Sequence, residues 1–467
     1  MTPDSFFLSE WHARRPGERR SLPRARSLAA ALGLLEQAKP VLSVVGSKGK
    51  GTTAIYASAC LAAAGWRVVT VTSPGYRRAE ERIRVNGRAI SPAGLLELAG
   101  RLQAALGPRA DHPRADHKGP DHPRAGGRAA GRAADHSRAD RSRTDHPAAS
   151  HPAASHPAAS HPAASRGAAD GYLAPTGLFT LAGMLHAREV AADVTVLEAG
   201  MGGTSDEISL FTPTVAALTP IFAEHLGVLG DTQAEIARDK AGIVTPSTRA
   251  VLTLPQPDDV AREIADTVNR QSGGRVQLEV VDPGRTPVPA ALLPAGLGAR
   301  NAVLGCAAAL RLLRTLGHPP PVRAQLAAVL GSLRLPGRLS RHQLPGSGTE
   351  LIVDSAINRA GIAAALAVTV GCWTEIDHVL VCLPDHKDVP GAISELAGLP
   401  VTFVRLPDER LRFDHPLPAD WRVIDAADLT RELVTGLGRR VLALGTVYFT
   451  GRVLDLVDAD TERLFVC

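Results

Sequence analysis

The sequence predicts an α/β protein with two parallel-rich units, and three observations lead to this fold class. Short apolar runs alternate with Ala- and Leu-rich stretches of helical length, as in residues 41–45 followed by residues 52–64. The apolar runs are almost continuous in hydrophobic residues, which is typical of parallel strands that are covered on both faces. A Leu-Pro-Gly-Arg segment at residues 335–338 then separates two such alternations. We therefore expect two domains, at residues 1–334 and 335–467.

The individual strands follow from the positions of these apolar runs. In the first domain we expect strands at residues 41–45, 67–71, 193–197, 215–219 and 250–254. In the second domain we expect them at residues 351–353, 379–382, 401–404 and 441–444, again with helical stretches between them. One helix is expected at residues 233–241, and another begins near residue 299.

A low-complexity segment interrupts the first domain at residues 108–170. It contains four tandem HPAAS pentapeptides, eight of the sixteen histidines and hardly any large apolar residue. Such a segment cannot bury enough apolar surface to offset the entropy lost on ordering, so we expect disorder there. A His-rich tract is able to bind transition metals. We favour a repeat expansion without a catalytic function.

Composition and charge exclude several classes of protein. Without residues 108–170 the net charge falls from +5 to +2, which removes most of the case for nucleic-acid binding. No apolar run is long enough for a transmembrane helix, and residues 1–19 lack the apolar core of a signal peptide. The five cysteines lie far apart without a C-x-x-C motif, as expected of reduced thiols. We therefore expect a cytoplasmic protein without a membrane partner.

Lysine is rare, with six residues against 46 arginines. Arginine replaces lysine easily on a solvated surface, but not where a compact ammonium or a deprotonatable amine is needed. Lys48 and Lys50 lie in the candidate phosphate loop at residues 46–52, and Lys240 and Lys387 are further lysines to examine for a role in phosphate or metal binding.

The junction between the first strand and its helix is a candidate phosphate loop. Glycines allow successive backbone N–H groups and the helix N-terminus to point at one anion. We expect Lys50 to reach the terminal phosphates and the Thr52 hydroxyl to face Mg²⁺. The usual G-x-x-x-x-G-K-[ST] spacing is not met, because Val44 occupies the position of the first glycine and Gly51 separates Lys50 from Thr52. The loop residues are Gly46, Ser47, Lys48, Gly49, Lys50, Gly51 and Thr52.

These departures are themselves a signature that continues along the chain. The motifs are GSKGKGT (46–52), TSP (72–74), ERIRVNG (81–87), LEAGMGG (197–203), EH (224–225), LGDT (229–232), IARDKAGI (236–243), PGR (336–338) and DSAIN (354–358). In this order they resemble the motifs of the folylpolyglutamate synthase/dihydrofolate synthase branch of the Mur ligase family. The resemblance implies an N-terminal P-loop ATPase domain and a C-terminal Rossmann-like α/β domain.

The resemblance also implies a reaction. The family joins a carboxylate to an amino acid through an acyl phosphate, releasing ADP and phosphate. It implies ATP as co-substrate, two Mg²⁺ sites, and a small carboxylate acceptor and an amino acid as partners. We expect a monomer.

The site residues implied by the resemblance fall into three groups. The catalytic residues are Lys50, His225 and Lys240, and Lys240 is carbamylated in the family so that it bridges metal ions. The metal ligands are Thr52, Glu198, His225 and carbamylated Lys240. Beyond the phosphate loop, the residues on the ATP side are Asn301, Arg338 and Asp354. The residues on the acceptor side are Ser73, Arg82 and Asp206.

Three positions depart from the family pattern: Gly75 and Ile357 replace histidines, and Thr204 replaces an arginine. An enzyme that has lost the polar side chains that bound one substrate should no longer use that substrate, or should no longer distinguish it well from others. Two alternatives to a folate ligase therefore stay open. One is a specialised amide ligase with a non-folate acceptor. The other is a degenerate ATP-binding partner subunit.

Overall fold

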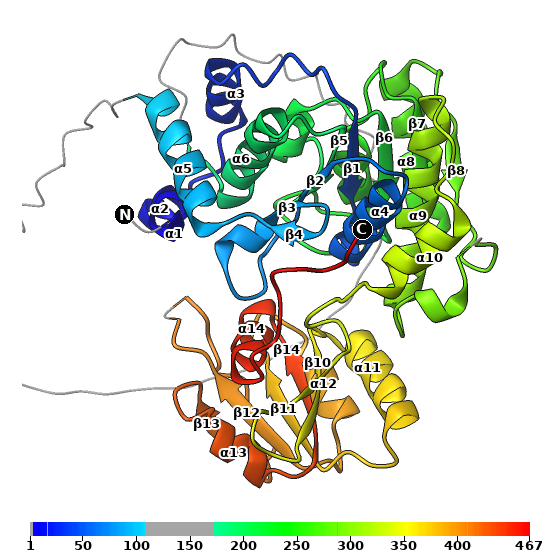
Figure 1. The fold of residues 1–467 in the computed structure, drawn as a ribbon. Helices are drawn as coiled ribbons and strands as arrows, with labels where there is room; N and C mark the ends of the chain where they lie inside the picture. Colours follow the sequence, from blue (N-terminus) through cyan, green and yellow to red (C-terminus); the bar gives the residue numbers. More distant parts are fainter. Residues whose placement is uncertain (1–2, 16, 108–170, 287, 409) are drawn as a thin grey trace, which may run out of the picture. The chain divides into compact units, whose positions relative to one another are not determined.

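The structure is a computed structural model that describes residues 3–15, 17–107, 171–286, 288–408 and 410–467. The disorder expected at residues 108–170 therefore lies outside the described residues. Residues 1–107 together with 169–467 form one compact unit, which contains two β-sheets (Figure 1). Within the described part of the chain, no helix has both the length and the apolar character needed to cross a membrane.

The first sheet has eight strands in the order β4-β3-β2-β5-β1-β6-β7-β8. The neighbouring strands in the run β2-β5-β1-β6-β7-β8 are all parallel. Strands β3 and β4 extend the sheet beyond β2 as an antiparallel edge. The central strands β1, β5 and β6 are buried along their whole length, as their apolar sequences require. The strands are β1 (Val41–Val45), β2 (Val68–Val71), β3 (Ile83–Val85), β4 (Arg88–Ala89), β5 (Val194–Glu198), β6 (Val215–Leu218), β7 (Ala250–Thr253) and β8 (Leu278–Val280).

Helices cover both faces of this sheet. Alternate residues of β1 point to opposite faces, so Leu42 and Val44 belong to one apolar cluster while Val41 and Val45 belong to two others. The helices on the Leu42 face are α4 (Lys50–Ala63), α9 (Gly298–Thr315) and α10 (Arg323–Gly331). On the other face lie α1 (Pro3–Phe7), α3 (Leu22–Ala31), α5 (Pro92–Leu106), α6 (Pro175–Glu189), α7 (Gln233–Ala241) and α8 (Asp258–Ser272).

The second sheet has six strands in the order β13-β12-β11-β14-β10-β9. Its neighbours are parallel except β9, which is antiparallel to β10. One face is covered by α11 (Arg359–Cys372) and α12 (Val389–Glu395), the other by α13 (Arg431–Gly436) and α14 (Val447–Leu456). The strands are β9 (Ser340–Gln343), β10 (Glu350–Asp354), β11 (His378–Cys382), β12 (Val401–Arg405), β13 (Arg422–Asp425) and β14 (Arg440–Gly445).

The predicted fold class is confirmed, and every strand expected from an apolar run is present within two residues of its expected ends. The helix expected at residues 233–241 has those bounds. Five strands were not expected: β3, β4, β8, β9 and β13. All five lie at or next to a sheet edge, where a strand needs no continuous apolar sequence. The division into domains at residue 334 stays a prediction.

Two segments link the layers around the two sheets. Tyr76, from the loop after β2, packs against the apolar cluster between the second sheet and α14, and Arg77 donates to Asp455 and to the Ala459 carbonyl. After α14 the chain returns to the first sheet as residues 459–465, which we call the return segment. Its Leu464 and Phe465 are buried in the cluster of α4 and α9.

Two buried charged residues hold the return segment. Arg84 on β3 is 1% exposed and donates to the carbonyls of Gly87, Thr461 and Glu462. Glu81 accepts from the Thr461 hydroxyl at 2.6 Å. The return segment is therefore fixed to the edge of the first sheet by buried charged side chains.

Candidate functional site

The phosphate loop joins β1 to α4 in a conformation that only glycine adopts without strain. Gly46 has a φ of 131° and Gly49 a φ of 85°, both in the region that disfavours other residues. A Cβ atom on Gly46 would overlap the Thr219 hydroxyl, and one on Gly49 would overlap the Asn301 amide. The glycines therefore let the loop pack closely against Thr219 and Asn301, and its residues 47–52 line a cavity at the N-terminus of α4, where a phosphate cradle is expected.

Two lysine ammonium groups converge on this loop. Lys50 Nζ donates to the carbonyls of Gly46 and Ser47, at 3.2 Å each. Lys240 Nζ donates to the same Gly46 carbonyl at 2.9 Å, and its side chain is 1% exposed. Burial lowers the pKa of Lys240, and the positive charge of Lys50 lowers it further. The structure thus brings α7 and its buried lysine directly behind the phosphate loop.

An acidic residue partners the buried lysine. Glu224 Oε1 lies 3.4 Å from Lys240 Nζ, in the loop after β6. Burial raises the pKa of Glu224, but Lys50 and Lys240 outweigh this effect, so the pKa lies below its ordinary value. The next residue, His225, is exposed and has a φ of 55°, and its pKa is lowered chiefly by burial of part of the ring. Glu224, to which sequence reasoning assigned no role, is therefore the acidic partner of Lys240.

Glu198 is the last residue of β5 and faces the start of α4. Its side chain accepts from the Ser73 backbone N–H at 3.0 Å, and the residue is 7% exposed. Burial raises its pKa, while Lys50 and the Ser73 hydrogen bond oppose the rise. A Cβ atom on Gly51 would lie 3.5 Å from Glu198 Oε2, so the carboxylate sits against the first turn of α4.

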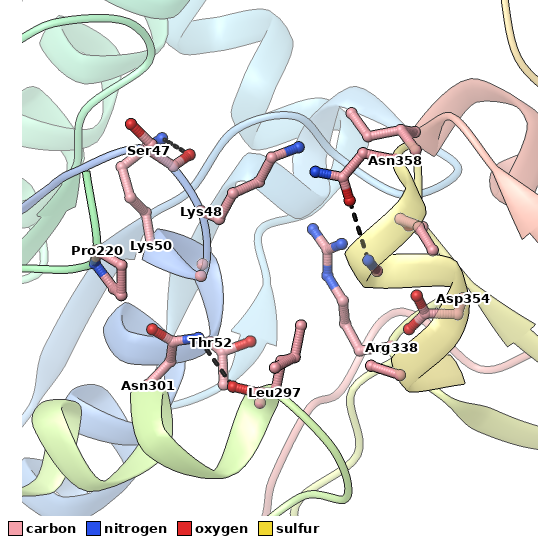
Figure 2. A pocket seen from close by; sticks show the side chains of 18 of the residues that line it. Ser47, Lys48, Lys50, Thr52, Pro220, Leu297, Asn301, Arg338, Asp354 and Asn358 are labelled. Carbon is pink, nitrogen blue, oxygen red and sulfur yellow. Dashed lines mark hydrogen bonds between the residues drawn. The ribbon is translucent and has the colours of Figure 1, made fainter. Parts of the chain in front are cut away.

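A cavity of about 870 Å³ opens in front of this group and is lined by residues of both sheets and their helices. Lys48 and Arg338 extend into it from opposite walls (Figure 2). Asp354, at the end of β10, accepts from the Leu339 N–H at 2.8 Å, and burial raises its pKa to about 6 although Arg338 opposes the rise. Burial also lowers the pKa of Lys48.

Asn301 marks the wall formed by α9. Its side-chain nitrogen donates to the Leu297 carbonyl at 3.2 Å (Figure 2), whereas its side-chain oxygen is buried without a partner. The Thr219 hydroxyl, beside Gly46, is also buried without a partner. Such unsatisfied polar atoms are rare in folded proteins and are often found where a ligand completes the hydrogen bonding.

Most of the sequence-predicted site residues line this one cavity, and some do not. The lining residues among them are Ser47, Lys48, Gly49, Lys50, Gly51, Thr52, Ser73, Glu198, Asn301, Arg338 and Asp354. Gly46 is the first residue of the loop, Lys240 lies behind it and donates to the Gly46 carbonyl, and His225 is next to Glu224 in the chain. The other two residues do not line the cavity: the Arg82 guanidinium stacks 4.5 Å from the Phe179 ring centre, and Asp206 is fully buried.

Sequence reasoning missed several residues of the site. Gln256 donates to the Thr219 carbonyl and accepts from the Ile221 N–H, which fixes the loop that carries Glu224. His386 and Tyr448 line the cavity from the second sheet, beside Lys387. Tyr448 is the second residue of α14, and residues 445–448 resemble a closing turn of the family, although sequence reasoning assigned no role to Tyr448.

The three departures from the family pattern have structural correlates. A side chain on Gly75 would overlap the Arg78 carbonyl, so the loop path itself excludes a histidine. Ile357 lines the cavity as an apolar residue. Thr204 donates to the Asp239 carbonyl on α7 and does not line the cavity.

The arrangement suits Mg²⁺ bound together with a nucleotide. Mg²⁺ in nucleotide enzymes takes one or two protein oxygens and completes its shell with phosphates and water. Thr52 and Glu198 supply such oxygens at the mouth of the phosphate cradle. Among the described residues there is no cluster of three or more His, Cys, Asp or Glu side chains that could hold a metal by itself. The donor set therefore fits a metal that needs phosphate oxygens as well.

Comparison with known proteins gives a consistent set of relatives, although no protein-family model matches the chain. A dihydrofolate synthase/folylpolyglutamate synthase of Mycobacterium tuberculosis is 29% identical over 413 residues, covering 80% of this chain and 72% of that protein. A probable bifunctional folylpolyglutamate synthase/dihydropteroate synthase of Haloferax volcanii is 26% identical over 401 residues, covering 80% of this chain. The match spans 40% of that protein, and 26% of a Halobacterium salinarum relative of the same name.

Solved structures of similar fold superpose on nearly the whole chain. A folylpolyglutamate synthase of M. tuberculosis complexed with ADP superposes with a TM-score of 0.68 and 22% identity, covering 98% of this chain and 99% of that one. A G51S mutant of the L. casei enzyme superposes with a TM-score of 0.70 and 20% identity, covering 97% and 99%. The chain is therefore related, in sequence and in fold, to the folylpolyglutamate synthase/dihydrofolate synthase branch of the Mur ligase family.

Proposed function

We propose that this chain is an ATP-dependent amide ligase, which joins an amino acid to a carboxylate acceptor through an acyl phosphate and releases ADP and phosphate. The observation that carries the proposal is the convergence of Lys50, Lys240 and Glu198 around one phosphate cradle. Phosphoryl transfer depends chiefly on positioning and charge neutralisation, which this group is built to provide. The relatives named above support the same reaction class.

The proposed reaction assigns a task to each part of the site. The open backbone of residues 46–51 binds the phosphates, and Lys50 turns from its loop carbonyls toward the terminal phosphate. Arg338, from the opposite wall, neutralises phosphate charge, while Asp354 is positioned to accept from the ribose. Two Mg²⁺ ions, held by Thr52 and Glu198 and by His225 and Lys240, would supply further charge neutralisation.

Carbamylation of Lys240 is part of the proposal. Addition of CO₂ to the amine gives a carboxylate-like group, and this reaction needs the neutral amine, which arginine cannot supply. Lys240 is buried beside Lys50 and Glu224, in a place where a second ammonium charge is costly. The proposal further takes the protein to act as a cytoplasmic monomer on small molecules.

The test is release of ADP and phosphate from ATP and Mg²⁺ in the presence of glutamate and either dihydropteroate or tetrahydrofolate. Turnover that requires both the acceptor and the amino acid supports a folate ligase. ATP binding without phosphate release in any acceptor mixture contradicts the ligase and favours a degenerate ATP-binding partner subunit.

A second candidate is a specialised ligase whose acceptor is not a folate. It is favoured by the loop at Gly75, where the Arg78 carbonyl leaves no room for a side chain, and by the apolar Ile357 in the cavity wall. Phosphate release with another carboxylic acid, and none with dihydropteroate or tetrahydrofolate, would support this candidate over the first.

A further inference from the structure

A largely buried arginine holds the glycine-rich loop that follows Glu198. Arg20 lies on the segment before α3, and its side chain is 13% exposed. Its Nη1 donates to Asp206 Oδ2 at 3.1 Å and to Glu207 Oε2 at 3.2 Å, and its Nη2 donates to the Met201 carbonyl at 3.0 Å. One planar guanidinium thus joins Met201, Asp206 and Glu207 from two of its nitrogens, a spread of donors that a compact lysine ammonium does not offer.

The loop needs such an anchor because of its sequence. Residues 200–206 contain three glycines and would sample many backbone conformations if left free. Asp206 Oδ2 accepts from the Met201 N–H at 2.8 Å, so both backbone polar groups of Met201 are held by the Arg20–Asp206 pair. Asp206, which we expected on the acceptor side, serves here as a buried anchor.

The far end of the same loop is fixed to α7. Asp239 accepts from the N–H groups of Gly203 and Ser205, at 2.8 and 3.1 Å. A Cβ atom on Gly203 would collide with the backbone of Lys240, so the loop lies directly against the residue that carries the buried amine. The loop therefore connects Glu198 at one end to Lys240 at the other.

The network carries one positive charge against two carboxylates. Glu207 is fully buried, its Oε1 has no hydrogen-bond partner, and its Cδ lies against Gly177 on α6. The ionisable groups that face it are Arg20, Asp206 and Tyr172. Burial and the charge of Asp206 raise the pKa of Glu207 to about 7, although Arg20 opposes the rise. When Glu207 is protonated, the positive charge of Arg20 is matched by the single negative charge of Asp206.

We propose that Arg20 is a positioning residue for the ligase reaction: by holding Met201 and Asp206 it sets the spacing between Glu198 and Lys240. The inference rests on the proposed function for its kinetic consequence. Arg20 touches neither the cavity nor the phosphate loop, so its loss should affect the chemical step more than nucleotide binding.

The kinetic test compares Arg20→Met and Arg20→Lys with wild type. Arg20→Met should lower kcat by about 10- to 100-fold, as expected when reacting groups are misplaced by about an ångström. The KM for ATP should change less than about threefold, because residues 46–52 are untouched. Arg20→Lys should recover part of the loss, since an ammonium can replace one or two of the three hydrogen bonds. Arg270→Met is the matched control: this exposed arginine of α8 pairs with Glu263, and its loss should leave kcat unchanged.

Hydrogen exchange provides a readout that does not depend on turnover. In Arg20→Met the amides of Met201, Gly203 and Ser205 should exchange faster than in wild type, while those of β5 stay protected. If wild type turns over and Arg20→Met has the same kcat, the positioning role is wrong although the ligase function stands. If wild type releases no phosphate with any acceptor but the loop amides exchange faster in Arg20→Met, the ligase function fails while the anchor stands.

If the Arg20→Met protein does not fold, the positioning role of Arg20 is tested with Arg20→Lys and Glu207→Gln instead. Glu207→Gln keeps the shape of the side chain and removes the second carboxylate, so Arg20 stays paired with Asp206. It should keep kcat within about twofold of wild type at pH 6.5. A loss as large as that expected for Arg20→Met would show that Glu207, and not the Arg20–Asp206 anchor, sets the loop, and would overturn the proposal.

Discussion

Lys240 Nζ lies 2.9 Å from the carbonyl oxygen of Gly46, the same oxygen that accepts from Lys50. A residue of α7 and the first residue of the phosphate loop are therefore joined directly, although 194 positions separate them in the sequence. The contact places two ammonium groups near one another in a buried setting. It makes Lys240 the residue whose substitution is most informative.

Lys240→Ala should abolish turnover, lowering kcat by at least about 100-fold, while the protein stays folded. Lys240→Arg should be equally inactive, because a guanidinium keeps the positive charge and cannot be carbamylated. Phosphate release measures the loss of turnover, and circular dichroism with urea unfolding shows whether the variants stay folded. Activity retained in Lys240→Ala would contradict the metal-bridging role. Lys39→Ala, in the loop before β1, is the control that should behave as wild type.

Gly49→Ala should weaken ATP binding by more than about tenfold and lower the free energy of unfolding by about 1–3 kcal/mol. The methyl group would overlap the Asn301 amide, and the φ of 85° adds strain. Gly65→Ala separates the two effects, because Gly65 has a φ of 87° with no atom within 4 Å of the added Cβ. It should cost about 1 kcal/mol and leave ATP binding unchanged. Equal effects of the two substitutions would mean that the loop is not packed as described.

Glu198→Gln should lower kcat by about 100-fold and raise the Mg²⁺ concentration needed for half-maximal activity. The amide oxygen can still accept from the Ser73 N–H, so the fold should persist, but the ligand charge is lost. Phosphate release is measured across a Mg²⁺ titration. Glu263→Gln, on α8, is the matched control. An unchanged Mg²⁺ dependence in Glu198→Gln would exclude this carboxylate as a metal ligand.

Arg84→Met should lower the free energy of unfolding by about 2–3 kcal/mol, because the carbonyls of Gly87, Thr461 and Glu462 each lose one hydrogen bond inside the protein. The carbonyls of Gly87 and Glu462 keep their backbone donors, whereas Arg84 is the donor to Thr461. Arg88→Met tests the same sheet edge with an exposed pair: Arg88 and Glu462 are 60% and 54% exposed, and their loss should cost less than about 1 kcal/mol. Urea unfolding compares both variants. Similar losses would show that burial at Arg84 does not govern the attachment of the return segment.

Glu207→Gln should make the protein more stable than wild type above pH 7, with little difference near pH 4.5. The folded pKa of about 7 lies above the ordinary value of 4.5, so the native state binds the proton more tightly than the unfolded state. Wild type therefore loses stability as the pH rises from about 4.5 through about 7. The gain at pH 8 should be on the order of 3 kcal/mol, because the two pKa values differ by about 2.5 units. Urea unfolding at pH 5 and pH 8 measures it, and a gain that is equal at both would exclude a titrating Glu207.

The central strands could be predicted because burial on both faces dictates their sequence. The apolar run of Val41, Leu42, Val44 and Val45 is sufficient to predict β1, and the glycines that follow it predict the turn. The edge strands β9 (Ser-Arg-His-Gln) and β13 (Arg-Val-Ile-Asp) could not be predicted in this way. Each is partly exposed, so its backbone pairing and not its side-chain pattern defines it.

In the candidate site, too, some features could be predicted from local sequence and others could not. The phosphate loop and Glu198 sit next to their own strands, so local sequence predicts where they point. The approach of Lys240 to Gly46 and the anchor from Arg20 to Met201 join residues 194 and 181 positions apart, and even Glu224 and Lys240, 16 positions apart, lie on different elements. Only the packing of α7 and of the segment before α3 against the sheet brings them together. Local patterns hold no information about such contacts.

The return segment has a consequence for the order in which the protein can be made. Leu464 and Phe465 complete an apolar core whose other members begin at Leu42, and the backbone of Leu464 bonds to Gly87 and Arg334. A ribosome delivers the chain from the N-terminus, so the first sheet has formed most of its core before these residues exist. That core therefore stays incomplete, with apolar surface uncovered, until residues 464 and 465 have been made.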